Sequence, residues 1–332
     1  ATECTVMKEL QDSPNTIKVE MTEGCNLRCG MCAIQGIREK AGGPYKFLTV
    51  ELARKIAMKV RSTGWNSKVE FTLRGEPLMN PYSAEIVGVF RKELPTTHLM
   101  ITSNALPLLR KPGVHENLDI LFSNGLNVLA LDAYKPSAKA IERVRQYNGV
   151  EIFDYLTGGG ISPYKKVPVS VKRIVIMEDF ETLVMSRQKL GVKIGNNHAG
   201  VGLPPTEDPL KKRCVRPFRE LVIRHDGKIP LCCNDWRGEY KIGDVSDYKS
   251  LIDLWNNPEF HAVRVSLYHR DRDFNPCGRC SDSGYRLGLL PDKLGKRKLP
   301  EPTKATRRII QRASGGEPYT KPVLREWEKI FR

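Results

Sequence analysis

The chain has 332 residues, enough to bury a sizeable core, and we interpret it as one large domain followed by a smaller one. It carries 54 Lys and Arg against 38 Asp and Glu, a formal net charge of +16, and an excess of this size more often accompanies a polyanionic partner than it serves solubility alone. No apolar run approaches the roughly 20 residues of a membrane span, and residues 1–10 lack a basic segment followed by an apolar one. We therefore expect a cytoplasmic protein without a membrane partner.

The first two thirds of the chain alternate between short apolar runs and helical patterns. The apolar runs predict strands over residues 17–21, 69–73, 98–102, 127–131 and 169–176. The helical patterns predict helices over residues 49–61, 81–92, 114–123, 136–147 and 179–190. This alternation predicts βα units in a parallel sheet, an α/β fold. Prolines at 203–209 indicate a linker, so the first domain is predicted to span residues 1–205.

Nine cysteines fall into groups, which favours metal binding over disulfides in a large chain of this type. Cys4 stands alone, and we interpret it as incidental. Cys25, Cys29 and Cys32 form a CxxxCxxC group just after the first predicted strand. Three thiolates are one fewer than a cubane [4Fe–4S] cluster takes, so the group indicates either a distant fourth Cys or an iron left open for a small molecule. A zinc site is the alternative, but structural zinc prefers CxxC pairs and four ligands.

The residues of this loop, with Asn26, Leu27 and Arg28 after the first cysteine, resemble those of the radical S-adenosylmethionine (radical SAM) superfamily. Met31 stands where the family often has an aromatic residue near the adenine, and a Met can also cover an apolar ring face. The resemblance implies a partial (β/α)6 TIM-like barrel with the loop at the carboxyl ends of its strands. It also implies that SAM chelates the open iron of a [4Fe–4S] cluster and is cleaved to a 5′-deoxyadenosyl radical, which abstracts hydrogen from substrate.

The segment after the second predicted strand resembles a further motif of that family. Gly75, Glu76 and Pro77 match the end of the GGEP motif, whose backbone and carboxylate hold the SAM amino group. A glutamate supplies the negative charge that an ammonium group needs, and a glycine lets the backbone approach closely. Arg74 replaces the first glycine, and an arginine here could reach a substrate or the SAM carboxylate.

Later segments resemble the remaining SAM contacts of the family. Ser103 and Asn104 end the third strand and resemble the segment near the SAM ribose and methionine. Asp132 ends the fourth strand and resembles the aspartate of the SxDG motif. Arg145, followed by an aromatic-rich segment over 147–155 that we predict to be helical, resembles the IRG…F continuation of the family. A surface salt bridge is an equally good account of Arg145.

The last cysteines, with the residues around them, resemble the SPASM/Twitch extension of radical SAM enzymes. The resemblance implies a small cluster-binding domain over 206–290 with one fully ligated auxiliary [4Fe–4S] cluster. Its ligands are Cys214, Cys232, Cys277 and Cys280. Cys233 could replace its neighbour, and a zinc knuckle with four cysteines is the alternative. The full SPASM form needs about seven cysteines here, so the shorter Twitch form fits better.

The final segment, 291–332, is predicted to be a basic tail with a terminal helix. Its cations would contact phosphates; they are Lys293, Lys296, Arg297, Lys298, Lys304, Arg307, Arg308 and Arg312. The apolar residues of its end follow a helical spacing and are Val323, Leu324, Trp327, Ile330 and Phe331. We expect this helix to pack on the body of the protein, with partner binding as the alternative.

These features together predict a radical SAM enzyme, an isomerase or an oxidoreductase. The charge favours a modified nucleobase in DNA or another nucleic acid as the substrate, with duplex bases flipped out to meet the radical. The alternatives are dehydrogenation of a small alcohol such as an aminocyclitol, peptide maturation, and a non-enzymatic iron–sulfur electron-transfer or binding protein. We expect an electron donor such as flavodoxin or ferredoxin. The auxiliary cluster could accept an electron from the substrate radical, conduct electrons or be structural, and no acid or base is identified.

Overall fold

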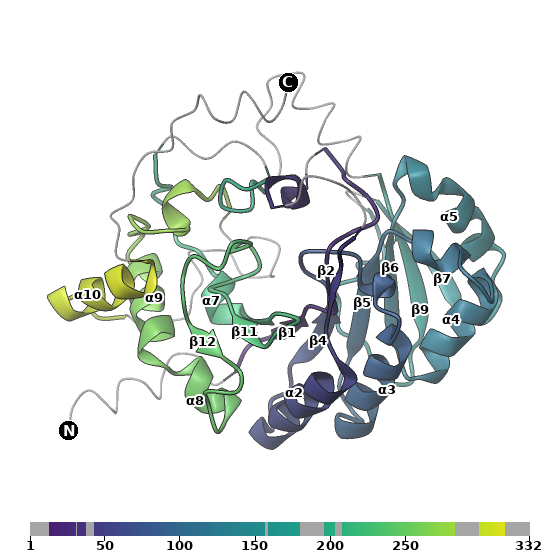
Figure 1. Ribbon diagram of the computed structural model, residues 1–332, viewed down its shortest axis with the longest axis horizontal. Coiled ribbons are helices and arrows are strands. Elements are labelled where there is room, and N and C mark those ends of the chain that lie inside the picture. The colour runs from purple at the N-terminus through teal and green to yellow at the C-terminus, as the bar shows by residue number, and fades with distance from the viewer. Residues whose placement is uncertain are drawn as a thin grey trace.

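The computed structural model describes residues 13–30, 32–37, 43–156, 159–179, 196–202, 208–282 and 299–315. Several of the expectations above lie wholly or almost wholly outside these residues: Cys4, Met31, the helix over 179–190, the tail cations at 293–298 and the terminal helix. The fold is a mostly parallel α/β sheet with helices on one face and the segment 208–282 on the other side (Figure 1).

The main sheet has eight strands in the order β10-β1-β4-β5-β6-β9-β7-β8, and every pairing except β7 with β8 is parallel. The strands are β1 (Thr16–Val19), β4 (Lys68–Phe71), β5 (Leu99–Ser103), β6 (Val128–Asp132), β7 (Glu151–Leu156), β8 (Gly159–Gly160), β9 (Arg173–Met177) and β10 (Glu220–Ile223). The predicted parallel βα architecture is confirmed, and the described strands form an open sheet, because no pairing among them joins β10 to β8.

Residues of opposite character alternate along the central strands. In β1 the side chains of Ile17 and Val19 are fully buried on the helix side, whereas Lys18 faces the opposite side. In β4, Phe71 packs edge-on against Phe90 of the helix layer, with ring centroids 5.0 Å apart, whereas Glu70 faces the same side as Lys18. Because successive side chains of a strand point to opposite faces, the apolar face carries the core and the other face carries charge.

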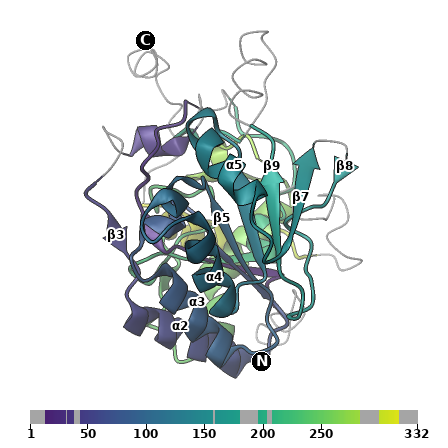
Figure 2. The same cartoon turned by 90° about the vertical axis from the view of Figure 1, so that its right-hand side faces the viewer.

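Four helices cover the apolar face (Figure 2), and they are α2 (Val50–Thr63), α3 (Ser83–Glu93), α4 (Val114–Ser123) and α5 (Ala138–Arg145). Thr49 starts the first of them, because its hydroxyl accepts a hydrogen bond from the Leu52 amide at 3.2 Å. Gly64 ends it in the left-handed conformation with φ of 67°. The predicted positions of these four helices are confirmed to within about two residues, the usual uncertainty of helix ends.

The prediction of an aromatic-rich helix over 147–155 is wrong. Residues 151–156 form β7, the neighbour of β9, so that β9 lies between β6 and β7. The segment contains Ile152, Phe153 and Tyr155, and β-branched and aromatic residues favour strands over helices. Arg173 lies over the ring of Phe153, 5.4 Å from its centroid, which is a contact between the two neighbouring strands.

The second part of the chain consists of short elements around a compact core. They are α7 (Arg216–Arg219), β11 (Lys228–Ile229), β12 (Gly243–Asp244), α8 (Leu251–Trp255), α9 (Pro258–Tyr268), the 3₁₀ turn η6 (Cys277–Arg279) and α10 (Lys304–Ala313). Trp255 is fully buried, with the Arg264 guanidinium 4.0 Å from its ring centroid. Its ring also meets Trp65, just after α2, at 6.2 Å, so this core is continuous with the helix layer of the sheet.

The remaining elements are short and lie mostly at the carboxyl ends of the strands. They are β2 (Thr22–Glu23), β3 (Lys46–Phe47) and the 3₁₀ turns η2 (Ala33–Gly36), η3 (Pro77–Met79), η4 (Leu106–Leu109) and η5 (Lys135–Ser137). Within the part of the chain that the structure describes, no helix has both the length and the apolar character required to cross a membrane.

Candidate active site

The loop with three cysteines begins at the carboxyl end of β1 and is joined to the segment after β4. Gly24 and Gly75 form a parallel bridge, in which the Gly24 amide donates to the Arg74 carbonyl and the Glu76 amide donates to the Gly24 carbonyl, both at 3.0 Å. A Cβ atom on Gly75 would lie 2.3 Å from the Gly24 carbonyl oxygen. Only glycine therefore allows this close approach, which holds the cysteine loop against Glu76.

The Glu76 carboxylate lies at the centre of a set of hydrogen-bond donors. Its Oε1 accepts from the Ser103 hydroxyl at 2.8 Å and from the Leu78 amide at 3.0 Å, and its Oε2 accepts from the Asn104 amide at 2.7 Å. Burial raises the pKa of Glu76 to about 7, although these hydrogen bonds favour the charged form. A cationic ligand beside Glu76 would therefore be strongly favoured, since its charge would stabilise the carboxylate.

Asn104 connects this carboxylate to the cysteine loop. Its side-chain amide donates to Asn26 Oδ1 at 2.8 Å and to Cys25 Sγ at 3.5 Å. Burial, followed by the charge of Glu76, raises the pKa of the Cys25 thiol to about 12. A thiol in this environment needs the positive charge of bound iron to become a thiolate ligand. The residues of the loop therefore fit a cluster.

Asp132 is the second carboxylate of this region and ends β6, two strands away from β4 in the sheet. Burial, together with the charge of Glu76, raises its pKa to about 7. The structure thus brings together Gly75, Glu76, Ser103, Asn104 and Asp132 at the carboxyl ends of three strands. Such a concentration of acceptors fits the ammonium group and hydroxyls of a ligand such as SAM.

Pro77 and Arg145 have different environments. Pro77 is buried as the first residue of η3, where it positions the turn that presents Glu76. Arg145 ends α5 and forms an ion pair with Asp154, with Nη2 2.6 Å from Oδ1 and about half of each side chain exposed. This is the surface salt bridge that the sequence left as an alternative, and a SAM contact by Arg145 stays a prediction.

Arg74 lies in a buried ionic network. Its Nη2 lies 2.8 Å from Glu20 Oε2 and 2.6 Å from Glu23 Oε2, and its Nη1 donates to the Trp236 carbonyl at 3.1 Å. Burial would raise the pKa of Glu20, but hydrogen bonds from His225 and Arg74 outweigh it and lower the pKa to about 2. Arg74 therefore joins the ends of β1 and β4 to the segment after β10.

Two carboxylates and one imidazole of this network, those of Glu20, Glu23 and His225, lie within 4.8 Å of one another. Such a group could hold a metal ion, but the guanidinium of Arg74 bonds to both carboxylates. We therefore interpret the group as an ion-pair network and not as a metal centre.

The four predicted auxiliary ligands are all buried, each with 7–8% of its surface exposed, and they are Cys214, Cys232, Cys277 and Cys280. Burial raises the pKa of all four thiols, and it raises the pKa of Cys214 to about 11. Cys277 is close enough to Cys214 and Cys280 for their charges to interact, and Cys232 interacts in the same way with Cys277. The four thiols are thus buried close to one another, as the ligands of one metal cluster must be.

A tetrahedral zinc with Zn–S bonds of about 2.3 Å holds its sulfurs about 3.8 Å apart. Among the described residues, no three cysteine sulfurs lie within 4.8 Å of one another, so these four thiols do not have the spacing of a zinc site. Cys233 accepts a hydrogen bond from Arg216 Nη1 at 2.8 Å and lines a cavity, and Cys232 as the ligand stays a prediction.

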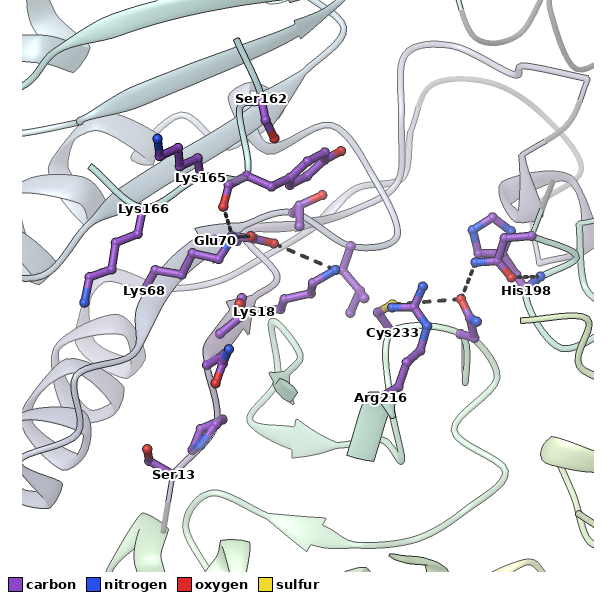
Figure 3. Close-up of a pocket in the computed structure, with 18 of the residues that line it drawn as sticks. Ser13, Lys18, Lys68, Glu70, Ser162, Lys165, Lys166, His198, Arg216 and Cys233 are labelled. Carbon is purple, nitrogen blue, oxygen red and sulfur yellow. Dashed lines mark hydrogen bonds and ion pairs between the residues drawn. The ribbon is translucent and has the colours of Figure 1, made fainter. Parts of the chain in front are cut away.

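A cavity of about 750 Å³ lies on the charged face of the sheet, between β1 and β4 and the segments 196–198 and 233–236. Figure 3 shows Lys68, Lys165 and Lys166 on one side of it and Arg216 and Cys233 on the other, with charged side chains between them. Its lining is therefore strongly polar, unlike the mostly apolar lining of many small-molecule sites.

The charged side chains that line this cavity, apart from Lys165 and Lys166 at its rim, are paired. Lys18 Nζ lies 3.8 Å from Glu70 Oε2 and 3.7 Å from Glu220 Oε2, and Arg216 Nη1 lies 3.2 Å from Glu220 Oε2. Lys68 pairs with Glu70 at 2.5 Å, and Arg216 also pairs with Asp282. Three cations thus face three carboxylates, and the inner cavity is close to neutral.

The rim of the cavity has an excess of positive charge. Lys165 and Lys166 lie in the loop before β9, where both are exposed, and Lys166 Nζ donates to the Asn66 carbonyl at 3.1 Å. Neither lysine forms an ion pair with a residue that the structure describes. This rim lies near Lys68, the first residue of β4, and thus at the opposite end of the strands from Glu76.

Apart from Cys233, the residues that line this cavity were not predicted from the sequence. Lys18 and Glu70 had a detectable signal, because each is a charged residue inside an otherwise apolar strand. Arg216, Asn196 and Asn234 carried no such signal, because only the tertiary fold brings them to β1.

The predicted basic tail is described only in part. Lys304, Arg307 and Arg308 are exposed on α10, and Arg312 pairs with Glu259 at 3.0 Å. The other predicted cations of the tail lie outside the described residues, and they are Lys293, Lys296, Arg297 and Lys298.

Comparison with protein families gives two matches. The model of the radical SAM superfamily matches residues 19–182, and the model of the SPASM iron–sulfur cluster-binding domain matches residues 214–281. The first range contains the three-cysteine loop and the Glu76 region, and the second contains all four auxiliary cysteines.

Individual relatives match over a smaller part of the chain. GTP 3′,8-cyclase 2 of Mycobacterium bovis is 33% identical over 99 residues, which are 30% of this chain and 27% of the relative. GTP 3′,8-cyclase of Edwardsiella ictaluri is 28% identical over 117 residues, 35% of each protein. The chain thus matches about a third of the length of these curated relatives. The crystal structure of BtrN in complex with AdoMet and 2-DOIA has a TM-score of 0.60 at 16% identity, covering 82% of this chain and 94% of that chain, which shows a shared fold.

Proposed function

The chain belongs to the radical SAM superfamily and carries a C-terminal SPASM-type cluster-binding domain, and from this premise we propose that it abstracts hydrogen from a phosphate-bearing nucleobase substrate. Its cofactors are SAM, the [4Fe–4S] cluster that binds SAM and an auxiliary iron–sulfur cluster. When bound, SAM and its cluster supply the 5′-deoxyadenosyl radical that removes the hydrogen. The protein supplies binding, orientation and exclusion of water.

For the cofactor seat, we propose that Cys25, Cys29 and Cys32 ligate three irons. Glu76 would accept from the SAM ammonium group, because its pKa of about 7 falls when a cation replaces the lost solvation. Asp132 and Asn104 would orient the rest of SAM, since both lie beside Glu76. Cys214, Cys232, Cys277 and Cys280 would hold the auxiliary cluster. A flavodoxin or ferredoxin would supply the electrons.

The substrate proposal rests on one observation, the charge distribution of the cavity. Its inner part is neutral, with three cations facing three carboxylates, and its rim adds Lys165 and Lys166. A ligand with an uncharged or zwitterionic body and phosphate at one end matches this arrangement. The phosphate would lie at the rim, and the body would extend toward Glu76 and SAM.

The nucleic-acid form of this substrate is the one that the net charge favours. A volume of about 750 Å³ is of the size of pockets that enclose one small ligand, so a duplex would have to extrude the reacting base. The exposed cations on α10 would then contact phosphates outside the cavity. A free nucleotide is the second candidate, because the curated relatives are named for an activity on GTP.

A turnover panel would test the substrate class. Anaerobically reconstituted enzyme is incubated with SAM, reductant and, in turn, GTP, other nucleotides, single-stranded DNA with modified bases, and an aminocyclitol. We expect faster release of 5′-deoxyadenosine and a new product mass with DNA, and with GTP if the second candidate is right. Stimulation by the aminocyclitol alone would contradict both.

Charge reversal at the rim would test how the substrate is held. Lys165→Glu with Lys166→Glu should weaken DNA binding and flatten its dependence on salt, because two phosphate contacts are lost. Lys55→Glu, on the exposed surface of α2, is the matched control for a general change of charge. Equal loss of binding in both variants would show that the rim has no special role.

A further inference from the structure

Asn234 lies between the cavity and the auxiliary cysteines. It is buried, with 1% of its surface exposed, and it lines the cavity beside Asn196 and Cys233. Its Nδ2 lies 3.7 Å from Cys280 Sγ and donates to Asp282 Oδ2 at 3.0 Å. One side chain therefore touches both the proposed substrate site and a predicted cluster ligand.

The orientation of the Asn234 amide follows from its partners. A carboxylate accepts hydrogen bonds and does not donate them, so the NH₂ group must face Asp282 and, on the same side, Cys280. The carbonyl Oδ1 then faces the other way, where it accepts from Asn196 Nδ2 at 2.5 Å and lies 3.9 Å from Cys233 Sγ. The Asn234 amide therefore has a defined orientation, with its N–H and not its oxygen toward the Cys280 sulfur.

A hydrogen bond to a cluster thiolate changes the redox properties of the cluster. The reduced cluster carries one more negative charge than the oxidised one, and a donor toward its sulfur stabilises the more negative form. Hydrogen bonds to the sulfurs are one of the main determinants of cluster potential. An N–H held toward Cys280 therefore raises the reduction potential.

We propose that Asn234 is a positioning residue that raises the reduction potential of the auxiliary cluster and makes it sensitive to what occupies the cavity. The link to the cavity is Asn196, which lines it and donates to Asn234 Oδ1. A substrate group that engages Asn196 would change the polarisation of the Asn234 amide and hence its bond to Cys280. The role of the cavity rests on the proposed function, whereas the effect on potential needs no substrate.

The test is a redox titration of the reconstituted holoenzyme, followed by electron paramagnetic resonance without any substrate. The signal that changes when SAM is added belongs to the first cluster, and the other signal belongs to the auxiliary cluster. For Asn234→Leu we expect the ratio of reduced to oxidised auxiliary cluster at a fixed potential to fall about tenfold, which is 59 mV for one electron. Asn234→Asp should lower it further, because it removes the donor and adds negative charge.

Two further variants make the result specific. Asn196→Ala should shift the auxiliary potential in the same direction but less, because it removes only the partner of the carbonyl oxygen. Asn66→Ala is the matched control: it lines the same cavity and bonds to Lys166, and it should leave both potentials unchanged. The iron content of each variant checks that both clusters are assembled.

Each outcome decides the proposal. An unchanged auxiliary potential in Asn234→Leu, or an equal shift of both clusters, would overturn it. A shift in Asn234→Leu with none in Asn196→Ala would retain the tuning role and overturn the link to the cavity. Failure of every substrate in the turnover panel would overturn the proposed function and leave this measurement unaffected.

Discussion

The loop of Cys25–Cys32 and the four auxiliary cysteines differ in the number of thiols and in burial. The loop has three partly exposed cysteines, and acceptors for a small molecule, Glu76 and Asp132, lie beside it. The auxiliary site has four buried cysteines. A cluster site that leaves one iron to a small molecule needs access from solvent and polar groups that bind that molecule. A site in which protein ligates every iron can be buried away from solvent. The same residue type thus serves a reactive centre and an enclosed one.

The largest expected effect separates the two sites by cysteine replacement. Cys29→Ala should abolish SAM cleavage and leave about four irons of the expected eight or so, because each cubane holds four. Cys277→Ala should also remove about four irons but keep 5′-deoxyadenosine release. Iron analysis and chromatography of the SAM products measure both. Loss of SAM cleavage in both variants would mean that the two sites do not work independently.

The second prediction concerns the network that joins the two regions. Arg74→Met should destabilise the protein by about 3–5 kcal/mol, because it leaves buried Glu20 without its main cationic partner. Denaturant unfolding at pH 7 measures the loss, and Lys55→Ala, which breaks an exposed pair, should show no measurable change. A double variant with Glu20→Gln should recover part of the stability.

The same network predicts a dependence on pH. The lowered pKa of Glu20, about 2 against 4.5, stabilises the fold above pH 4.5, and this contribution is lost as the pH falls toward 2. Between pH 4.5 and pH 2, the free energy of unfolding of the Arg74→Met variant should therefore fall less than that of the unaltered protein. An equal loss in both would assign the acid sensitivity to other groups.

The third prediction tests the SAM seat alone. Glu76→Gln should weaken SAM binding about 10- to 150-fold, the equivalent of about 1.5–3 kcal/mol for a hydrogen bond to a charged group. In the unaltered protein, SAM affinity should rise between pH 6 and pH 8, because Glu76 and Asp132 both have pKa values of about 7 and only the carboxylates attract the ammonium group. Calorimetry at several pH values measures both effects. A flat pH profile would contradict the assignment.

The smallest expected effect is that of Arg145→Ala. Its ion pair with Asp154 is about half exposed, so stability should change by no more than about 0.5 kcal/mol. SAM affinity should also be unchanged if the surface pair is its only role. A clear loss of SAM affinity would instead support the contact that the family resemblance implies.

Local patterns in the sequence indicate how Gly75 and Glu76 are placed, whereas their contacts with SAM stay a prediction. Gly75 and Glu76 follow a strand, and the close approach to Gly24 allows no residue but glycine at position 75. The prediction of a helix over 147–155 was wrong because the β-branched and aromatic residues of this segment favour a strand, which pairs with β9. Arg74 was expected to reach a substrate or the SAM carboxylate, but it bonds to Glu20 and to the Trp236 carbonyl. These partners lie 54 residues before it and 162 residues after it, so the chain around Arg74 gives no sign of them.

The cavity on the charged face was beyond prediction for a similar reason. Lys18 pairs with Glu70 and Glu220, and these three residues come from three different strands of the sheet. Sequence shows each charge but not which charges neutralise one another. The net charge of +16 therefore pointed to a polyanion, whereas the fold divides the cavity into a neutral interior and a basic rim.

The pairing of β10 with β1 has a consequence for how the two regions depend on each other. Four residues of each strand are in register, from Thr16 opposite Glu220 to Val19 opposite Ile223. β10 is itself the edge strand of the described sheet, and without it the open edge would move to β1, the strand that leads into the cysteine loop. Exposed edges invite pairing with other molecules. A chain cut before residue 214 also loses the elements packed around β10, so it should self-associate even though it retains every residue proposed for the SAM seat.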